Sequence, residues 1–167
     1  LDRLASFPFR YLATRGITGI MSSHLNVPAL DNSGTPSSLS EKIINGYLRD
    51  EIGFNGFVVT DAINMKGVQT QDGRAGVEAL KAGNDMIEFV PDVEKAISEV
   101  KAAVAAGEIT MNEINEKCRR VLALKRWAGL HLYQPAKTEA ITSRLNSPYY
   151  EVTNRKLIKG ALTVLTN

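Results

Sequence analysis

Three short segments of this sequence stand at the ends of apolar runs, and each carries a side chain that can act as acid, base or nucleophile. They are Ser23-His24, Thr60-Asp61 and Glu88-Phe89-Val90. In parallel α/β folds, reactive groups gather where strands pass into the following loops. Asp61 is the leading candidate, because a carboxylate held at the end of a buried strand can serve as nucleophile, general base or phosphoacceptor.

Each candidate also has a plainer interpretation. Asp61 could cap the next turn in solvent. His24 could donate a hydrogen bond to a ligand or act as acid or base, but it could equally pair with a backbone carbonyl. Met65 and Phe89 are more typical of packing residues than of a pocket lining. Asp85 is expected to cap or pair locally.

Composition excludes several classes of partner. The 167 residues carry a formal net charge of +2, from 20 Lys and Arg against 18 Asp and Glu, so nothing indicates nucleic acid as partner. No run of about 20 apolar residues predicts a membrane span. The single cysteine, Cys118, is expected to be buried in a helix, and no His/Cys cluster predicts a metal site. The residues Arg119, Arg120, Lys125 and Arg126 are expected to form a solvated helix face.

Elements that would position the candidates alternate along the chain. Short apolar runs predict strands over residues 17–23, 57–60 and 85–90. Helical periodicity predicts helices over residues 7–14, 38–52, 73–82, 92–107 and 110–127, with Asp92 as an N-cap. Capping-box spacing at Ser38–Glu41 and at Thr110–Glu113 marks two of the helix starts. This alternation predicts an α/β fold with parallel strands.

The composition changes near Tyr133. Residues 131–147 resemble a linker, residues 149–160 have a helical pattern, and residues 161–165 form an apolar run that predicts a further strand. A domain boundary is therefore expected near Tyr133. We also expect the second domain to be cut short at Asn167.

The segment Gly53-Phe-Asn-Gly-Phe-Val-Val-Thr-Asp61-Ala-Ile-Asn-Met65-Lys-Gly67 resembles the nucleophile segment of family-3 glycoside hydrolases. Two flanking segments, residues 20–30 and 80–87, resemble the neighbouring strands in the N-acetylglucosaminidase branch of that family. Residues 114–130 resemble its closing helix, and residues 154–167 the start of its second domain. The order of these blocks matches the family along nearly the whole chain.

The resemblance implies the C-terminal portion of a (β/α)8 TIM-like barrel, followed by the beginning of an α/β sandwich domain. Residues 1–132 would belong to the barrel, residues 133–147 to a linker and residues 148–167 to the truncated second domain. A complete barrel needs about 200–250 residues, so the chain is expected to be a fragment. Such a fragment would expose an apolar sheet edge and could self-associate through it.

The resemblance also implies a mechanism. Asp61 would attack the anomeric carbon of a terminal β-linked N-acetylglucosamine, and water would hydrolyse the covalent glycosyl-enzyme with retention. His24 and Met65 are the candidate substrate-binding residues. The family's acid/base loop, Lys-His-x-Pro-Gly-His, is absent from this sequence. The isolated chain is therefore expected to be inactive, and no metal or organic cofactor is implied.

Two other functions stay open. The run Val58–Met65 also resembles the strand-Asp-x-x-Met segment of phosphoacceptor receiver domains, although Lys66 stands where Pro would be expected. Asp31 and Asp50 lie in the wrong elements to form the acidic pair of such a domain. The third function is a non-catalytic sugar-binding module that keeps the fold.

Overall fold

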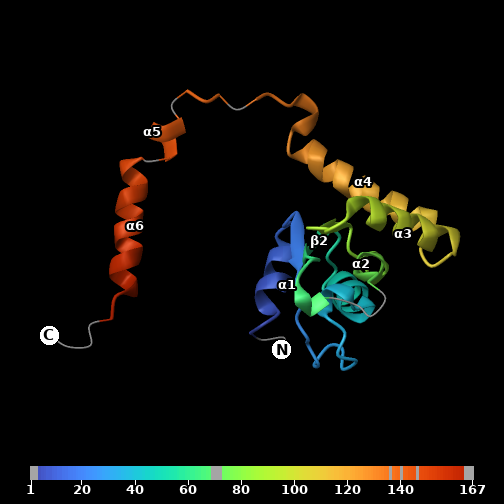
Figure 1. The fold of residues 1–167 in the computed structure, drawn as a ribbon. Coiled ribbons are helices and arrows are strands. Elements are labelled where there is room, and N and C mark those ends of the chain that lie inside the picture. Colours follow the sequence, from blue (N-terminus) through green and yellow to red (C-terminus); the bar gives the residue numbers. More distant parts are fainter. Residues whose placement is uncertain (1–3, 69–72, 136, 140, 146, 164–167) are drawn as a thin grey trace. The chain divides into compact units, whose positions relative to one another are not determined.

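The computed structural model describes residues 4–68, 73–135, 137–139, 141–145 and 147–163. The chain divides into two compact units, Leu1–His131 and Leu132–Asn167. Figure 1 shows strands and helices alternating along the first unit and helices in the second.

The first unit is built on a three-stranded parallel sheet in the order β1-β2-β3. The strands are β1 (Gly19–Ser22), β2 (Phe57–Ala62) and β3 (Met86–Glu88). All three strand predictions are confirmed, with shorter bounds at β1 and β3. The predicted fold class, α/β with parallel strands, is confirmed as well.

Helices and single helical turns connect the strands and follow the sheet, and most of the helices match the predicted ranges. They are α1 (Phe7–Thr14), the turn η1 (Ser37–Leu39), η2 (Lys42–Glu51), the turn η3 (Lys66–Val68), α2 (Ala75–Ala82), α3 (Val93–Ala105), α4 (Met111–Trp127) and the turn η4 (Leu130–Leu132). Asp92 caps α3 by accepting a hydrogen bond from the Lys95 amide, as predicted.

One face of the sheet is covered and the other is open. Val58 and Thr60 of β2 are fully buried on the covered face. Side chains alternate along a strand, so Val59 and Asp61 point to the opposite face. Met21 pairs with Val59 in the register of β1 and β2, and its side chain is 53% exposed. The open face therefore carries Asp61 at its carboxyl edge.

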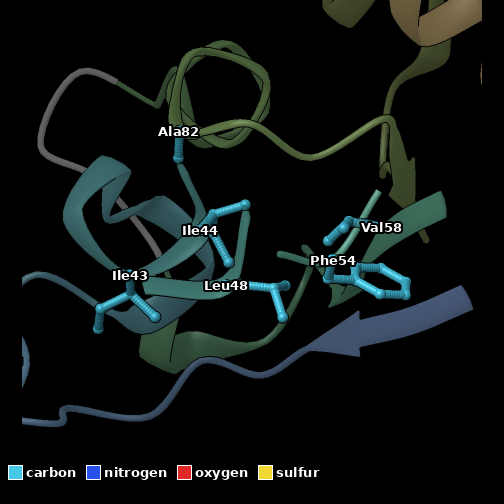
Figure 2. Close-up of a cluster of buried hydrophobic side chains, with 6 residues drawn as sticks. All are labelled: Ile43, Ile44, Leu48, Phe54, Val58 and Ala82. Atoms are coloured by element: carbon cyan, nitrogen blue, oxygen red, sulfur yellow. The ribbon is translucent and has the colours of Figure 1, made fainter. Parts of the chain in front are cut away.

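The main apolar cluster lies under the covered face. Figure 2 shows Ile44 and Leu48 of η2 between Ala82, at the end of α2, and the pair Phe54 and Val58. Burial of these groups ties the helix to the sheet, at about 25 cal/mol for each Å² removed from water. The cluster consists of Ile43, Ile44, Leu48, Phe54, Val58 and Ala82.

The two predicted capping boxes had different outcomes. The box at Thr110–Glu113 is confirmed, with both reciprocal hydrogen bonds present. The prediction of a box at Ser38–Glu41 is wrong, because no capping box forms there. The hydroxyl of Ser40 accepts the amide of Ile43 instead, and η2 begins at Lys42 with i→i−5 hydrogen bonding. Ser38 is left available for a contact elsewhere in the fold.

Gly83 ends α2 in a conformation that requires glycine. Its φ is +115°, in the region that disfavours side chains. A Cβ atom at this position would lie 2.1 Å from Oδ1 of Asn45. The close approach brings α2 against η2 and directs the chain into β3.

The second unit contains α5 (Ile141–Leu145) and α6 (Pro148–Ala161). Ser147 caps α6 by accepting the Tyr149 amide. None of the described residues from 132 to 163 is buried. The strand predicted over residues 161–165 is wrong at Ala161, which ends α6, and at residues 162–163, which are irregular. Residues 164–165 lie outside the described part, and the predicted linker and sandwich domain stay predictions.

Two predictions about α4 are wrong. Cys118 is exposed rather than buried. Arg120 does not belong to a solvated face, because its guanidinium bonds a buried carboxylate. Among the described helices, none combines the length and apolar character needed to cross a bilayer. Self-association through the sheet edge stays a prediction.

Candidate active site

Asp61 lies one residue before the end of β2, at the carboxyl edge of the sheet. Its side chain is half-buried, and its Oδ1 accepts a hydrogen bond of 2.8 Å from the amide of Ala62. No other hydrogen bond to this carboxylate is present among the described residues. One oxygen is thus fixed by the backbone, while Oδ2 accepts no hydrogen bond from a described residue.

His24 lies at the same edge, after β1, and both of its ring nitrogens are engaged. Nε2 is 3.0 Å from the carbonyl oxygen of Ala62, and Nδ1 is 2.6 Å from the hydroxyl of Ser38. A carbonyl can only accept, so Nε2 is the donor to Ala62, and the hydroxyl of Ser38 can donate to Nδ1. The contact with a backbone carbonyl matches the plainer interpretation of His24; a direct role in substrate binding stays a prediction.

The prediction that Met65 and Phe89 are packing residues is wrong. Their side chains are 47% and 68% exposed. Phe89 directly follows β3 and has a φ of +49°, which is uncommon for a residue with a large side chain. Both residues follow strands at the carboxyl edge of the sheet. The proposed role of Met65 in substrate binding stays a prediction.

Sequence reasoning missed a buried polar network next to His24. Asn84 is fully buried, and its amide nitrogen donates to the carbonyl oxygens of Ser38 (2.8 Å) and Ala79 (2.7 Å). Its Oδ1 accepts the hydroxyl of Ser22 at 2.6 Å. Each polar atom of the amide is therefore satisfied, as burial requires. The available signal was the Asn84-Asp85 pair between a helix-ending glycine and an apolar strand.

Asp85 is the centre of a charged cluster, so the prediction of local pairing is wrong. Its carboxylate has no solvent exposure and accepts hydrogen bonds from Arg49 and Arg120, each at 2.9 Å. The Val58 amide donates a third bond of 2.8 Å. Burial lowers the pKa of Arg49 and of the nearby Lys117. The cluster attaches η2 and α4 to the sheet.

Asp31, in the loop after β1, is a second buried carboxylate. Hydrogen bonds from the hydroxyl of Ser40 and from the amide of Ser33, at 2.6 and 3.1 Å, hold its pKa well below the usual range. Lys42 lies 3.4 Å from the carboxylate and adds a weaker effect. These contacts fix the loop that leads from His24 to η2.

Two hollows of about 280 Å³ lie beside the sheet. One is lined by α1, β1 and η2, and the other by α2, β3 and α3. Asp61 lines neither of them, so it stands on an open edge of the unit. Within the described part of the chain, no group of three or more His, Cys, Asp or Glu residues could hold a metal ion.

Residues 1–124 match the family model described as the N-terminal domain of glycosyl hydrolase family 3. The chain is 27% identical, over 168 residues, to a beta-N-acetylglucosaminidase/beta-glucosidase of Cellulomonas fimi; the match covers 94% of this chain and 30% of that protein. It is 32% identical over 130 residues to the beta-hexosaminidase LpqI of Mycobacterium tuberculosis, covering 71% and 32% of the two chains.

A solved structure is similar as well. It is a family-3 beta-N-acetylglucosaminidase from a Paenibacillus strain, with a TM-score of 0.75 and 31% identity. The match covers 84% of this chain and 28% of that one, so the chain spans about a third of the length of its relatives. The similarity is consistent with part of a TIM-like barrel. It favours the hydrolase interpretation over the phosphoacceptor alternative.

Proposed function

Because this chain belongs to glycosyl hydrolase family 3, we propose that it supplies the nucleophile of a retaining β-N-acetylglucosaminidase. Asp61 attacks the anomeric carbon of a terminal β-linked N-acetylglucosamine, and the aglycone leaves with a proton from a general acid. Water then cleaves the glycosyl ester on Asp61, and the sugar is released with its β configuration. The relatives named for this activity support the choice of sugar.

The observation that carries the proposal is the setting of Asp61. A nucleophile needs a fixed direction and an available lone pair. The Ala62 amide holds Oδ1, and the carboxyl edge of a parallel sheet is where α/β enzymes bind their substrates. Asp61 faces the side of the sheet that would become the interior of a closed barrel.

The acid/base group is proposed to come from outside this chain. Retaining hydrolysis needs a proton donor close to the nucleophile, with carboxyl pairs about 5–5.5 Å apart in the usual case. Both ring nitrogens of His24 are engaged by protein atoms. His131 is exposed in η4, far along the chain from the sheet edge. We therefore expect the 167-residue chain to have no measurable turnover by itself.

The test compares this chain with the longest polypeptide encoded in frame with it. Both are assayed with 4-methylumbelliferyl N-acetyl-β-glucosaminide, and the anomer first released is identified by proton NMR. A slow 5-fluoro glycosyl fluoride of N-acetylglucosamine is used to trap the covalent intermediate. We expect turnover with retention in the longer polypeptide only, and a labelled peptide that contains Asp61.

Two variants complete the test. Asp61→Asn should lower kcat at least about a thousandfold, because it removes the nucleophile. Asp50→Asn changes an exposed carboxylate of η2 and should leave kcat unchanged. Label on another residue, or an active Asp61→Asn protein, contradicts the proposal. Binding of N-acetylglucosamine without hydrolysis would instead favour the sugar-binding module.

The domain organisation is proposed on the same basis. Residues 1–132 form the last part of the barrel domain, residues 133–147 the linker and residues 148–167 the start of a second domain. The match to the Cellulomonas protein extends over 94% of the chain, beyond the 124 residues of the family model, and supports this continuation.

A further inference from the structure

We propose that His24 is a positioning residue for Asp61, held in its orientation by Ser38 and Asn84. This inference rests on the proposed function of Asp61 and adds a residue whose role is to aim the nucleophile. His24 touches neither the carboxylate nor, in this proposal, the reacting atoms. It acts through the backbone of Ala62.

The peptide units on either side of Ala62 connect the two side chains. The amide of Ala62 donates to Oδ1 of Asp61 at 2.8 Å, and the carbonyl oxygen of the same residue accepts Nε2 of His24 at 3.0 Å. That oxygen also accepts the amide of Met65 at 3.1 Å. Ala62, whose amide orients the carboxylate, is thus held by His24 in the loop after β1 and by Met65 in the turn after β2.

Ser38 holds the second nitrogen of His24, because the carbonyl of Ala62 already makes Nε2 the donor. Its hydroxyl lies 2.6 Å from Nδ1 and donates to it when Nε2 bonds the carbonyl of Ala62. The hydroxyl of Ser38 can contact Nδ1 of His24 because it does not cap the start of η2. An imidazole held at both nitrogens keeps one ring orientation, as does a metal-binding histidine whose other nitrogen is hydrogen-bonded.

Asn84 holds Ser38 in turn. Its buried amide donates to the carbonyl oxygen of Ser38, and it accepts the hydroxyl of Ser22 at the end of β1. Ser38 and Asn84 are both fully buried. A satisfied network without exposed members is rigid. Its last contact reaches Ala62, directly beside the proposed nucleophile.

The experiment uses the longest polypeptide encoded in frame with the chain and four variants. His24→Ala removes both hydrogen bonds. His24→Gln keeps an N–H donor at the distance of Nε2. Ser38→Ala removes only the contact at Nδ1. Ser37→Ala is the matched control, because Ser37 lies on the same turn and its 2.6 Å bond goes to the backbone carbonyl of Ser23 and not to the ring of His24.

We expect His24→Ala to lower kcat about 10- to 100-fold while KM stays within about twofold, since misplacing a reacting group costs rate rather than binding. Ser38→Ala should lower kcat less. His24→Gln should restore most of the rate, and Ser37→Ala should match the wild type. Thermal unfolding of each variant is measured to keep the assays below the transition.

A second measurement does not depend on turnover. Hydrogen exchange by mass spectrometry follows the peptide that contains the amides of Ala62 and Met65. We expect faster exchange there in His24→Ala than in Ser37→Ala, in any form of the protein that folds. If His24→Ala equals Ser37→Ala both in exchange and in kcat, the inference is overturned.

The failures of the two proposals are distinguishable. If Asp61→Asn abolishes turnover but His24→Ala keeps the wild-type kcat, Asp61 is the nucleophile and His24 does not position it. If Asp61→Asn stays active, the proposed function fails whatever His24 does. A loss that appears as raised KM, and is not rescued by His24→Gln, shows direct substrate contact and overturns the inference.

Discussion

Asn84 and Asp85 are neighbours in sequence and both are buried, yet their surroundings differ. Asn84 makes only neutral hydrogen bonds, to a hydroxyl and to two carbonyl oxygens. Asp85 bonds two guanidinium groups and a backbone amide. The first network leads to the edge that carries Asp61, while the second attaches two helices to the sheet.

The difference shows that burial selects a side chain by the partners it meets. Carbonyl oxygens need donors, which an amide supplies and an ionised carboxylate does not. Guanidinium groups need an anion, which an amide does not supply. Near a proposed nucleophile, a neutral network holds the backbone without adding a charge that would shift the reactivity of the carboxylate.

The largest effect should follow removal of the charge at Asp85. Asp85→Asn keeps the shape but leaves Arg49, whose side chain is 13% exposed, without its counter-ion. We expect a loss of about 3–5 kcal/mol in the free energy of unfolding, measured by urea denaturation. The control is Glu51→Gln, which breaks the exposed pair between Arg10 and Glu51 and should cost less than about 1 kcal/mol. Equal losses in the two variants would show that the buried ion pairs of Asp85 stabilise the fold no more than an exposed pair does.

The converse change places a charge in the neutral network. Asn84→Asp directs a carboxylate at the carbonyl oxygens of Ser38 and Ala79, so its folded-state pKa should rise above the unfolded value. The penalty then appears as the pH rises past about 4, and we expect about 3 kcal/mol at pH 7. Urea midpoints at pH 4 and pH 7 measure it. If Asn84→Asp is as stable as the wild type at pH 7, the surroundings of Asn84 accept a charge, and the two regions do not differ in this respect.

A smaller effect should come from a single hydroxyl of the neutral network. Ser22→Ala leaves Oδ1 of Asn84 without its 2.6 Å donor, and we expect a loss of about 1–2 kcal/mol. Ser98→Ala, on the exposed face of α3, is the control and should change stability by less than about 0.5 kcal/mol. A Ser22→Ala variant that matches this control would indicate that the hydroxyl is not part of the network.

Asp31 shares a feature with each of the two regions: it is a buried carboxylate like Asp85, but its donors are mainly neutral, as around Asn84. We expect the smallest change in the free energy of unfolding there. Its lowered pKa contributes stability that is fully present above the unfolded pKa of about 3.9 and is lost as the pH falls through the folded value. Asp31→Asn should therefore be less stable than the wild type at pH 7, and the difference should begin to narrow as the pH falls below about 4, so that it is smaller at pH 3. Urea midpoints at both pH values test this, and a constant difference would contradict it.

Much of the first unit could be predicted from sequence because its signals are local. The strands at Phe57–Ala62 and Met86–Glu88 are short apolar runs, and α3 begins at an Asp cap that acts three residues away. The candidate at Asp61 needed only its place after an apolar run. The strand predicted at residue 161 failed because an apolar run continued an existing helix instead of starting a new element.

Local patterns misplaced the residues whose partners are distant. Ser38 has the spacing of a capping box, but its hydroxyl contacts a histidine 14 residues earlier. Asp85 was expected to pair locally, yet its guanidinium partners lie 35 and 36 residues away. Arg120 has the spacing of a solvated helix face, but its guanidinium group bonds the buried carboxylate of Asp85.

In the first unit, the sequence by itself determined which segments form strands and helices and which carboxylate lies near the end of a buried strand, because periodicity and capping act over a few residues. Only the tertiary structure decided that Asn84 meets Ser22 across 62 residues and that His24 reaches the peptide after Asp61. A buried polar group must find its partner in the folded state, and that partner depends on which faces the packed elements present to one another.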